Sequence, residues 1–271
     1  MVELHAAVYG ADPLHPHKPH LLVLHGLFGM GDNWATLARR WSDDWVVHTL
    51  DLRNHGQSPW DAEHTYAALA ADVLAYQDRT NLPAAVWLGH SMGGKVAQWG
   101  ACTYPERVRA LVSVDMAPKA YPPHHQEIFD ALGAVDFAQC RSRNDVDAVL
   151  AARIAHPGVR QFLLKNVGRP TPDTLAWKFN LNVLIRNYVE ITRALPPEFT
   201  YAGPVLFVRG GLSGYMEEQE LPLLRAHFPQ AQLETVPQAG HWVHAEQPEA
   251  FSRTVMNFLQ TIPAPTEPGN S

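Results

Sequence analysis

The sequence has little cysteine, no block of like charge and no long apolar run. Its two cysteines, Cys102 and Cys140, form neither a disulfide framework nor a metal-binding pattern. No stretch of about 18 apolar residues is present to cross a bilayer, and residues 1–5 lack the basic and apolar pattern of a secretory signal. The net charge is −6 without a basic cluster, which gives no support to nucleic-acid binding. We therefore expect a soluble cytoplasmic protein that uses neither a cofactor nor a metal ion.

The chain does contain enough apolar residues for a large buried core. Hydrophobic residues make up 46% of its 271 residues and charged residues 18%, which is typical of a globular enzyme. Short β-rich apolar runs alternate with segments of helical period, and this alternation predicts parallel strands in βαβ units. The expected strands are 3–8, 21–24, 46–50, 85–88, 110–114, 205–208 and 232–236. The expected helices between them are 66–78, 93–103, 217–228 and 247–260.

The alternation of strands and helices stops between residues 117 and 200. This stretch is too long for a simple loop, and its pattern predicts a helical cap inserted into the sheet order. The expected cap helices are 124–134, 144–154, 159–166 and 173–192. We therefore divide the chain into a first part of the core (1–116), the cap (117–200), a second part of the core (201–262) and a flexible, Pro-rich tail (263–271).

A Gly-x-Ser-x-Gly motif occupies residues 89–93, directly after an expected strand and before an expected helix. That context is the one a nucleophile elbow requires. Gly89 and Gly93 leave room for a tight, strained turn, which projects the hydroxyl of Ser91 above the sheet. A chance motif in a loop is the alternative, and the flanking strand and helix argue against it. The motif predicts that Ser91 is the nucleophile of a hydrolase.

A serine hydroxyl needs a base within hydrogen-bond distance to act as a nucleophile at neutral pH. In α/β sheets with a nucleophile elbow the chain order is serine, acid, histidine. His241, just after the last expected strand, is therefore the predicted base. His244 is the competing candidate, but we expect it to enter the following helix and to cap it or face solvent.

The oxyanion of the reaction needs two backbone N–H donors. One is expected from Met92, the residue after the nucleophile. The other is expected from the glycine-containing loop at residues 25–29, with Leu27 as the preferred donor and Phe28 as the alternative. His25 in the same loop is expected to bind loop backbone rather than to act as a second base.

Several motifs together resemble those of the bacterial YbfF-type esterases of the α/β-hydrolase fold. They are residues 25–29, Asp32-Asn33-Trp34, residues 51–58, residues 89–95, residues 114–118, residues 127–129, residues 177–180 and residues 240–246. The resemblance implies a mostly parallel, doubly wound sheet with an inserted helical cap. It also implies an esterase that cleaves esters of short to medium acyl chains through an acyl-enzyme.

The position of the acid is unusual for the fold. Most relatives in the superfamily carry it in a Gly-x-x-Asp turn, but here that turn ends in Ser213, which cannot replace a carboxylate. The YbfF-type enzymes resemble this chain in placing the acid one strand earlier, and Asp115 fits that position. In the alternative, Asp115 only caps the backbone at the entry to the inserted segment. Glu217 and Glu218 are the reserve candidates for the acid, and Asp51 is less favoured.

Aromatic residues are expected to line an acyl pocket beneath the cap. The candidates are Phe28, Trp177, Phe179 and Trp242. The substrate is expected to be a small acyl ester or thioester. An acyl-CoA thioesterase, a lactonase and a perhydrolase are alternative functions, because each would use the same three catalytic residues. A non-catalytic ligand receptor of this fold is the alternative outside enzymes.

Overall fold

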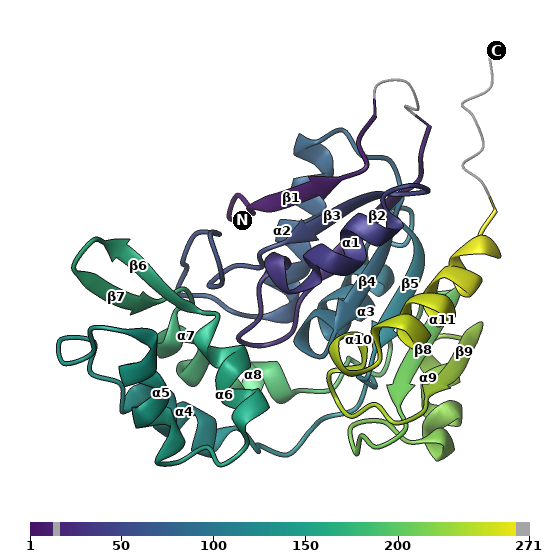
Figure 1. Cartoon of the computed structure of the whole chain (residues 1–271). Coiled ribbons are helices and arrows are strands. Elements are labelled where there is room, and N and C mark those ends of the chain that lie inside the picture. The colour runs from purple at the N-terminus through teal and green to yellow at the C-terminus, as the bar shows by residue number, and fades with distance from the viewer. Residues whose placement is uncertain (13–16, 264–271) are drawn as a thin grey trace.

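The computed structural model describes residues 1–12 and 17–263. Within these residues, seven strands form one sheet in the order β1-β3-β2-β4-β5-β8-β9 (Figure 1). They are β1 (Ala6–Tyr9), β2 (His20–Leu24), β3 (Val46–Leu50), β4 (Ala85–His90), β5 (Val108–Val114), β8 (Val205–Gly210) and β9 (Ala231–Val236). Strand β1 pairs antiparallel with β3, and the other neighbours pair in parallel. Each expected strand is present, in a mostly parallel α/β sheet.

Helices cover both faces of this sheet. Side chains from α1 (Ala35–Trp41), α10 (Val243–Glu246) and α11 (Pro248–Gln260) pack on one face. Side chains from α2 (Tyr66–Arg79), α3 (Met92–Thr103) and α9 (Leu221–His227) pack on the other. Because both faces are covered, central strands such as β4 are buried along their whole length, which explains their continuous apolar runs. Among the described residues, no helix has the length and apolarity needed to cross a membrane.

One of the expected core helices begins differently from the prediction, and a second matches it closely. The expected helix 217–228 starts as a 3₁₀ turn, η2 (Glu218–Glu220), before α9. The expected helix 247–260 is α11, preceded by the short α10. Gln247 lies before Pro248 and has φ −133° and ψ 61°. A residue that precedes proline is disfavoured in helical conformation, which explains the separation of α10 from α11.

The segment between β5 and β8 lies to one side of the sheet (Figure 1). It contains α4 (Gln126–Gly133), α5 (Arg143–Ala151), α6 (Pro157–Leu164), β6 (Val167–Thr171), β7 (Thr174–Trp177), α7 (Leu181–Arg186) and α8 (Tyr188–Thr192). The expected helix 173–192 is wrong, because its first part pairs as β7 with β6. Its helical part begins only after Asn180, whose side chain accepts a hydrogen bond from the N–H of Val183. The cap is thus helical with one β-hairpin.

A buried lysine binds both of the segments that connect the core with the cap. Lys95 of α3 is 1% exposed. Its ammonium group donates to the backbone carbonyls of Lys119, on the way into the cap, and Arg193, on the way out. Burial, with a smaller effect of the neighbouring cations, lowers the pKa of Lys95 to about 7. The cap is docked further by a hydrogen bond of 2.6 Å from the Asn166 side chain to the carbonyl of Phe28.

Candidate active site

Ser91 forms the turn between β4 and α3, in a strained backbone conformation. Its φ of 53° and ψ of −119° lie in a region that residues with a side chain rarely adopt. A Cβ on Gly89 would lie 2.0 Å from the carbonyl oxygen of Gly93, and one on Gly93 would lie 2.3 Å from the carbonyl oxygen of Leu24. Only glycine fits these two positions, so the motif allows the backbone to close tightly enough to present Ser91 at the start of α3.

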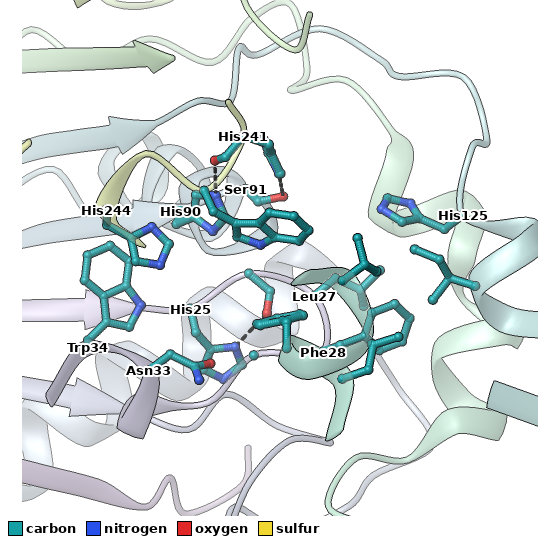
Figure 2. A pocket seen from close by; sticks show the side chains of 17 residues that line it. His25, Leu27, Phe28, Asn33, Trp34, His90, Ser91, His125, His241 and His244 are labelled. Atoms are coloured by element: carbon teal, nitrogen blue, oxygen red, sulfur yellow. Dashed lines mark hydrogen bonds between the residues drawn. The ribbon is translucent and has the colours of Figure 1, made fainter. Parts of the chain in front are cut away.

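The structure brings Ser91, Asp115 and His241 together. The Nε2 atom of His241 lies 3.0 Å from the Oγ atom of Ser91 (Figure 2). The Nδ1 atom of His241 lies 2.8 Å from the Oδ2 atom of Asp115. A carboxylate oxygen can only accept here, so Nδ1 carries the proton and Nε2 presents its lone pair to the serine hydroxyl. This is the geometry that general-base activation of a hydroxyl requires.

Asp115 follows β5 directly and is fully buried. Its backbone has φ 50°, and its N–H donates to the carbonyl of Val208 over 2.7 Å. Besides His241, the N–H of Gly210 donates to Oδ1 over 3.1 Å and the hydroxyl of Ser213 donates to Oδ2. Ser213, in the turn that ends without the expected carboxylate, therefore donates a hydrogen bond to Asp115 at the end of the neighbouring strand.

The reserve candidates for the acid lie elsewhere. Glu217 and Glu218 are exposed, and Glu218 forms an ion pair of 3.2 Å with Arg209. Asp51 accepts hydrogen bonds from the N–H groups of Gly31 (2.7 Å) and Gln57 (2.8 Å), so it holds loop backbone. Within residues 1–12 and 17–263, no carboxylate other than that of Asp115 bonds the His241 ring.

Two residues that the sequence reasoning missed hold His241 in place. His90, inside the Gly-x-Ser-x-Gly motif, is buried and donates from Nε2 to the carbonyl of His241 over 2.8 Å. Burial keeps the pKa of His90 well below its usual range, so the ring stays neutral. Tyr215 stacks on the His241 ring with centroids 3.8 Å apart and planes tilted by 16°. The hydroxyl of Tyr215 bonds to Nε2 of His124 in the cap. The position of His90 inside the motif could have indicated from the sequence that it lies at the site. Tyr215, in contrast, reaches the site only through the fold of the loop after β8.

The backbone donors expected for the oxyanion are free of protein acceptors. In the described part of the chain, no hydrogen bond engages the N–H of Leu27 or of Met92. The N–H of Phe28, the alternative donor, is engaged by Nε2 of His55 at 3.3 Å. A Cβ on Gly26 would lie 3.1 Å from the Cβ of Ser91, so the loop lies directly against Ser91. The geometry favours Leu27 over Phe28.

Two cavities meet at Ser91, and both are lined by Leu27, Ser91 and His125. The larger encloses about 60 Å³ and extends between the loop after β2 and the cap; its wall includes two of the expected pocket residues, Phe28 and Trp242. The smaller encloses about 20 Å³. Its remaining lining residues are Tyr66, Met92, Met116, Tyr121, His124, Tyr188, Ile191, Thr192 and Tyr215.

The other two expected pocket residues do not line either cavity. Phe179 is 1% exposed and stacks with Trp177 at a centroid distance of 5.2 Å. It also contacts the ring of Phe28 at 5.1 Å. Phe179 therefore supports Phe28 from the cap, and Trp177 packs behind Phe179. The sequence pattern could not separate such packing from lining a cavity, because a large apolar side chain suits both.

Neutral, buried histidines surround the site. His244 is buried and stacks on Trp34 with centroids 4.1 Å apart, so the expectation that it caps a helix or faces solvent is wrong. Burial lowers the pKa of His244 to about 3. His25 accepts from the N–H of Leu52 over 2.9 Å and donates to the carbonyl of Gly26 over 2.8 Å, and burial lowers its pKa to about 4. Among the described residues, no group of three or more His, Cys, Asp or Glu side chains is arranged to hold a metal ion.

Comparison with known proteins agrees with this architecture. A family model described as "alpha/beta hydrolase fold" matches residues 19–142. The chain is 37% identical to "Esterase YbfF" of Escherichia coli (strain K12), covering 95% of this chain and 99% of that protein. It is 36% identical to the "sn-1-specific diacylglycerol lipase ABHD11" of Mus musculus, covering 89% of this chain and 81% of that protein. A solved structure described as "Marine microorganism esterase" superposes with a TM-score of 0.91 at 33% identity, covering 95% of this chain and all of that one.

Proposed function

The chain belongs to the α/β-hydrolase family and is similar to esterases along nearly its whole length, and we propose that it is a serine esterase acting through Ser91, His241 and Asp115. The observation that carries the proposal is the continuous hydrogen-bond chain from Ser91 to Asp115. It runs over 3.0 Å from Oγ to Nε2 and over 2.8 Å from Nδ1 to Oδ2. Such a chain fits acyl transfer, in which one imidazole must accept a proton and later return it.

In the first step, Ser91 attacks the ester carbonyl while His241 takes its proton. Asp115 holds the imidazole in the required tautomer and stabilises its charged form. The N–H groups of Leu27 and Met92 bind the oxyanion, and each such donor is worth about 3–4 kcal/mol in comparable sites. The alcohol leaves with the proton from His241. A water molecule, deprotonated by His241, then attacks the acyl-enzyme, and the bond between the acyl group and Oγ breaks as His241 returns that proton to Ser91, which releases the acid product.

The lining of the larger cavity supports an apolar acyl chain of short to medium length. Apart from the residues around the serine, its cap side is formed by Ile128, Val159, Phe162 and Leu163. The enclosed space of about 60 Å³ is small, and the site lies beneath a docked cap. A long acyl chain would require the cap to move away from the loop that carries Phe28.

Hydrolysis rates on p-nitrophenyl esters and acyl-CoA thioesters of graded chain length test this function. Ser91→Ala should abolish turnover, and Asp115→Asn should lower kcat on the order of 10⁴-fold. The matched control is Glu217→Gln, which removes an exposed reserve carboxylate and should leave turnover normal. Near-normal turnover in Asp115→Asn, or its loss in Glu217→Gln, would contradict the assignment of the acid.

Two further outcomes would contradict the proposal itself. Preference for acyl-CoA over every oxygen ester would make the protein a thioesterase with the same residues. Labelling of Ser91 by a fluorophosphonate without turnover of any ester would make it a ligand receptor, because an activated serine alone does not complete the reaction.

A further inference from the structure

His125 is a second histidine at the site, and the proposed reaction does not use it. It lies at the start of α4 in the cap, and it lines both cavities together with Ser91. Figure 2 shows it across the cavity from Trp34 and His244, on the side formed by the cap. A polar ring in this position meets whatever occupies the space above the serine.

The hydrogen bonds of Tyr188 determine which nitrogen of His125 carries the proton. The hydroxyl oxygen of Tyr188 accepts from the backbone N–H of His124 (3.1 Å) and of His125 (3.0 Å). Both lone pairs are then used, so the hydroxyl proton is donated to Nδ1 of His125, 2.7 Å away. Nδ1 is therefore an acceptor, and the ring proton is on Nε2.

This Nε2–H group has no partner in the protein. Within the described residues, the His125 side chain forms a hydrogen bond through Nδ1 alone. His125 is half-buried and lines both cavities, so a substrate that fills this space displaces water from the donor and leaves it unsatisfied unless the substrate supplies an acceptor. The protein thus presents a donor of fixed direction to the substrate, on a rigid support.

We propose that His125 is a specificity-determining residue, whose Nε2–H binds an uncharged oxygen acceptor of the substrate close to the scissile carbonyl. This inference rests on the proposed esterase function and names the class of ester that the site selects. The preferred substrates carry an ether, ester or hydroxyl oxygen within two or three bonds of the ester group. Plain alkyl esters of the same shape are poorer substrates, because they leave the donor unsatisfied.

The surroundings favour an uncharged acceptor over a carboxylate. Burial, with smaller effects of His124 and His241, lowers the pKa of His125 to about 3, so the donor is neutral at pH 7. In the described part of the chain, neither cavity is lined by a lysine or an arginine. An anionic group would therefore be buried without a counter-ion.

Matched pairs of isosteric esters test the proposal on both sides of the scissile bond. On the acyl side, p-nitrophenyl methoxyacetate is compared with p-nitrophenyl butyrate. On the alcohol side, 2-methoxyethyl butyrate is compared with butyl butyrate. Each ratio of kcat/KM is divided by the ratio of alkaline hydrolysis rates, which removes the intrinsic reactivity of the ester. We expect a preference of roughly tenfold for the oxygenated ester in one of the two pairs.

The variants separate the effect of the N–H donor on the substrate preference from the effect of side-chain shape. His125→Phe keeps a ring and should lose the preference, whereas His125→Gln places an N–H at similar reach and should retain most of it. Tyr188→Phe removes the proton donor to Nδ1 and should weaken the preference. The control is His156→Phe, which changes an exposed histidine of the same cap and should leave the preference as in the wild type.

Fluorophosphonate labelling of Ser91 shows that each variant is folded. Equal normalised rates for both members of each pair in the wild type would overturn the inference, as would an undiminished preference in a labelled His125→Phe. These results leave the proposed function intact if butyrate esters are hydrolysed and Ser91→Ala abolishes that activity. Failure of the wild type to hydrolyse any of the four esters would overturn the proposed function and the inference with it.

Discussion

Five buried histidines predict a steep loss of stability in mild acid. Burial lowers the pKa to about 4 for His25, to about 3 for His55, His64 and His244, and well below the usual range for His90. In the unfolded chain each has a pKa of about 6.5. The unfolded state therefore binds protons that the folded state does not bind. This stabilisation is fully present above pH 6.5 and is lost as the pH falls towards 4.

The magnitude follows from the difference in proton binding between the two states. At pH 5.5, protonation of each histidine in the unfolded chain lowers the free energy of unfolding by about 1.4 kcal/mol. Five such histidines together lower it by about 7 kcal/mol, which is comparable to the whole stability of a typical domain. The folded state resists protonation for a local reason: in His25, for example, Nε2 accepts the N–H of Leu52, and a second ring proton would face that donor.

Urea unfolding followed by tryptophan fluorescence at pH 7.5, 6.5, 6.0 and 5.5 measures this dependence. We expect the slope near pH 5.5 to correspond to an uptake of at least about four protons on unfolding, because burial also lowers the pKa of His48 and of His125. His244→Phe keeps a ring against Trp34 and should reduce the uptake by about one proton. A free energy of unfolding that changes by less than about 1 kcal/mol between pH 7.5 and 5.5 would refute the reasoning.

Two sets of variants test the backbone strain at Ser91 and the position of the proposed catalytic acid. Ser91→Gly removes the conformational strain of φ 53° and should raise the free energy of unfolding by about 1 kcal/mol relative to Ser91→Ala. Turnover should be lost in both variants. A glycine variant that is less stable in urea than the alanine variant would contradict strain at this turn. Introducing Ser213→Asp into Asp115→Asn should restore at least about tenfold of the lost kcat, because the Ser213 hydroxyl already bonds the same oxygen as His241. The control is Asp115→Asn with Ser213→Ala, and equal activity of the two double variants would exclude a carboxylate supplied from the loop after β8.

The strands of the core could be predicted because local pattern and burial agree. A strand covered on both faces, such as β4, carries a continuous apolar run (residues 85–88), with Pro83 before it and Gly89 after it. The hairpin of β6 and β7 could not be predicted, because Gly168 through Thr171 are half-buried or exposed and show no alternation. Those residues pair as a strand through contact with β7 rather than through a pattern of their own.

The candidate site likewise contains residues that could be predicted from the sequence and residues that could not. Ser91 and His241 follow from motif and chain order, whereas Asp115 required the resemblance to a family, since one Asp after a strand is not distinctive. The positions of Tyr215 and His125 were not visible, because Tyr215 stacks on His241 through the fold of the loop after β8 and His125 is oriented by Tyr188 within the cap. His244 was misplaced because a polar residue near a helix start is usually solvated, while here the ring of Trp34 covers it.

The serine and the carboxylate project from adjacent strands at the same level. His90 of β4 pairs with Val114 of β5, and the N–H of Ser91 bonds the carbonyl of Val114 over 3.1 Å. The distance between their backbones is therefore set by the main chain of the sheet, while Gly210 and Ser213 orient the carboxylate. As a consequence, a change in the length or composition of the stretch after β8 should leave the spacing between the backbones of Ser91 and Asp115 unchanged.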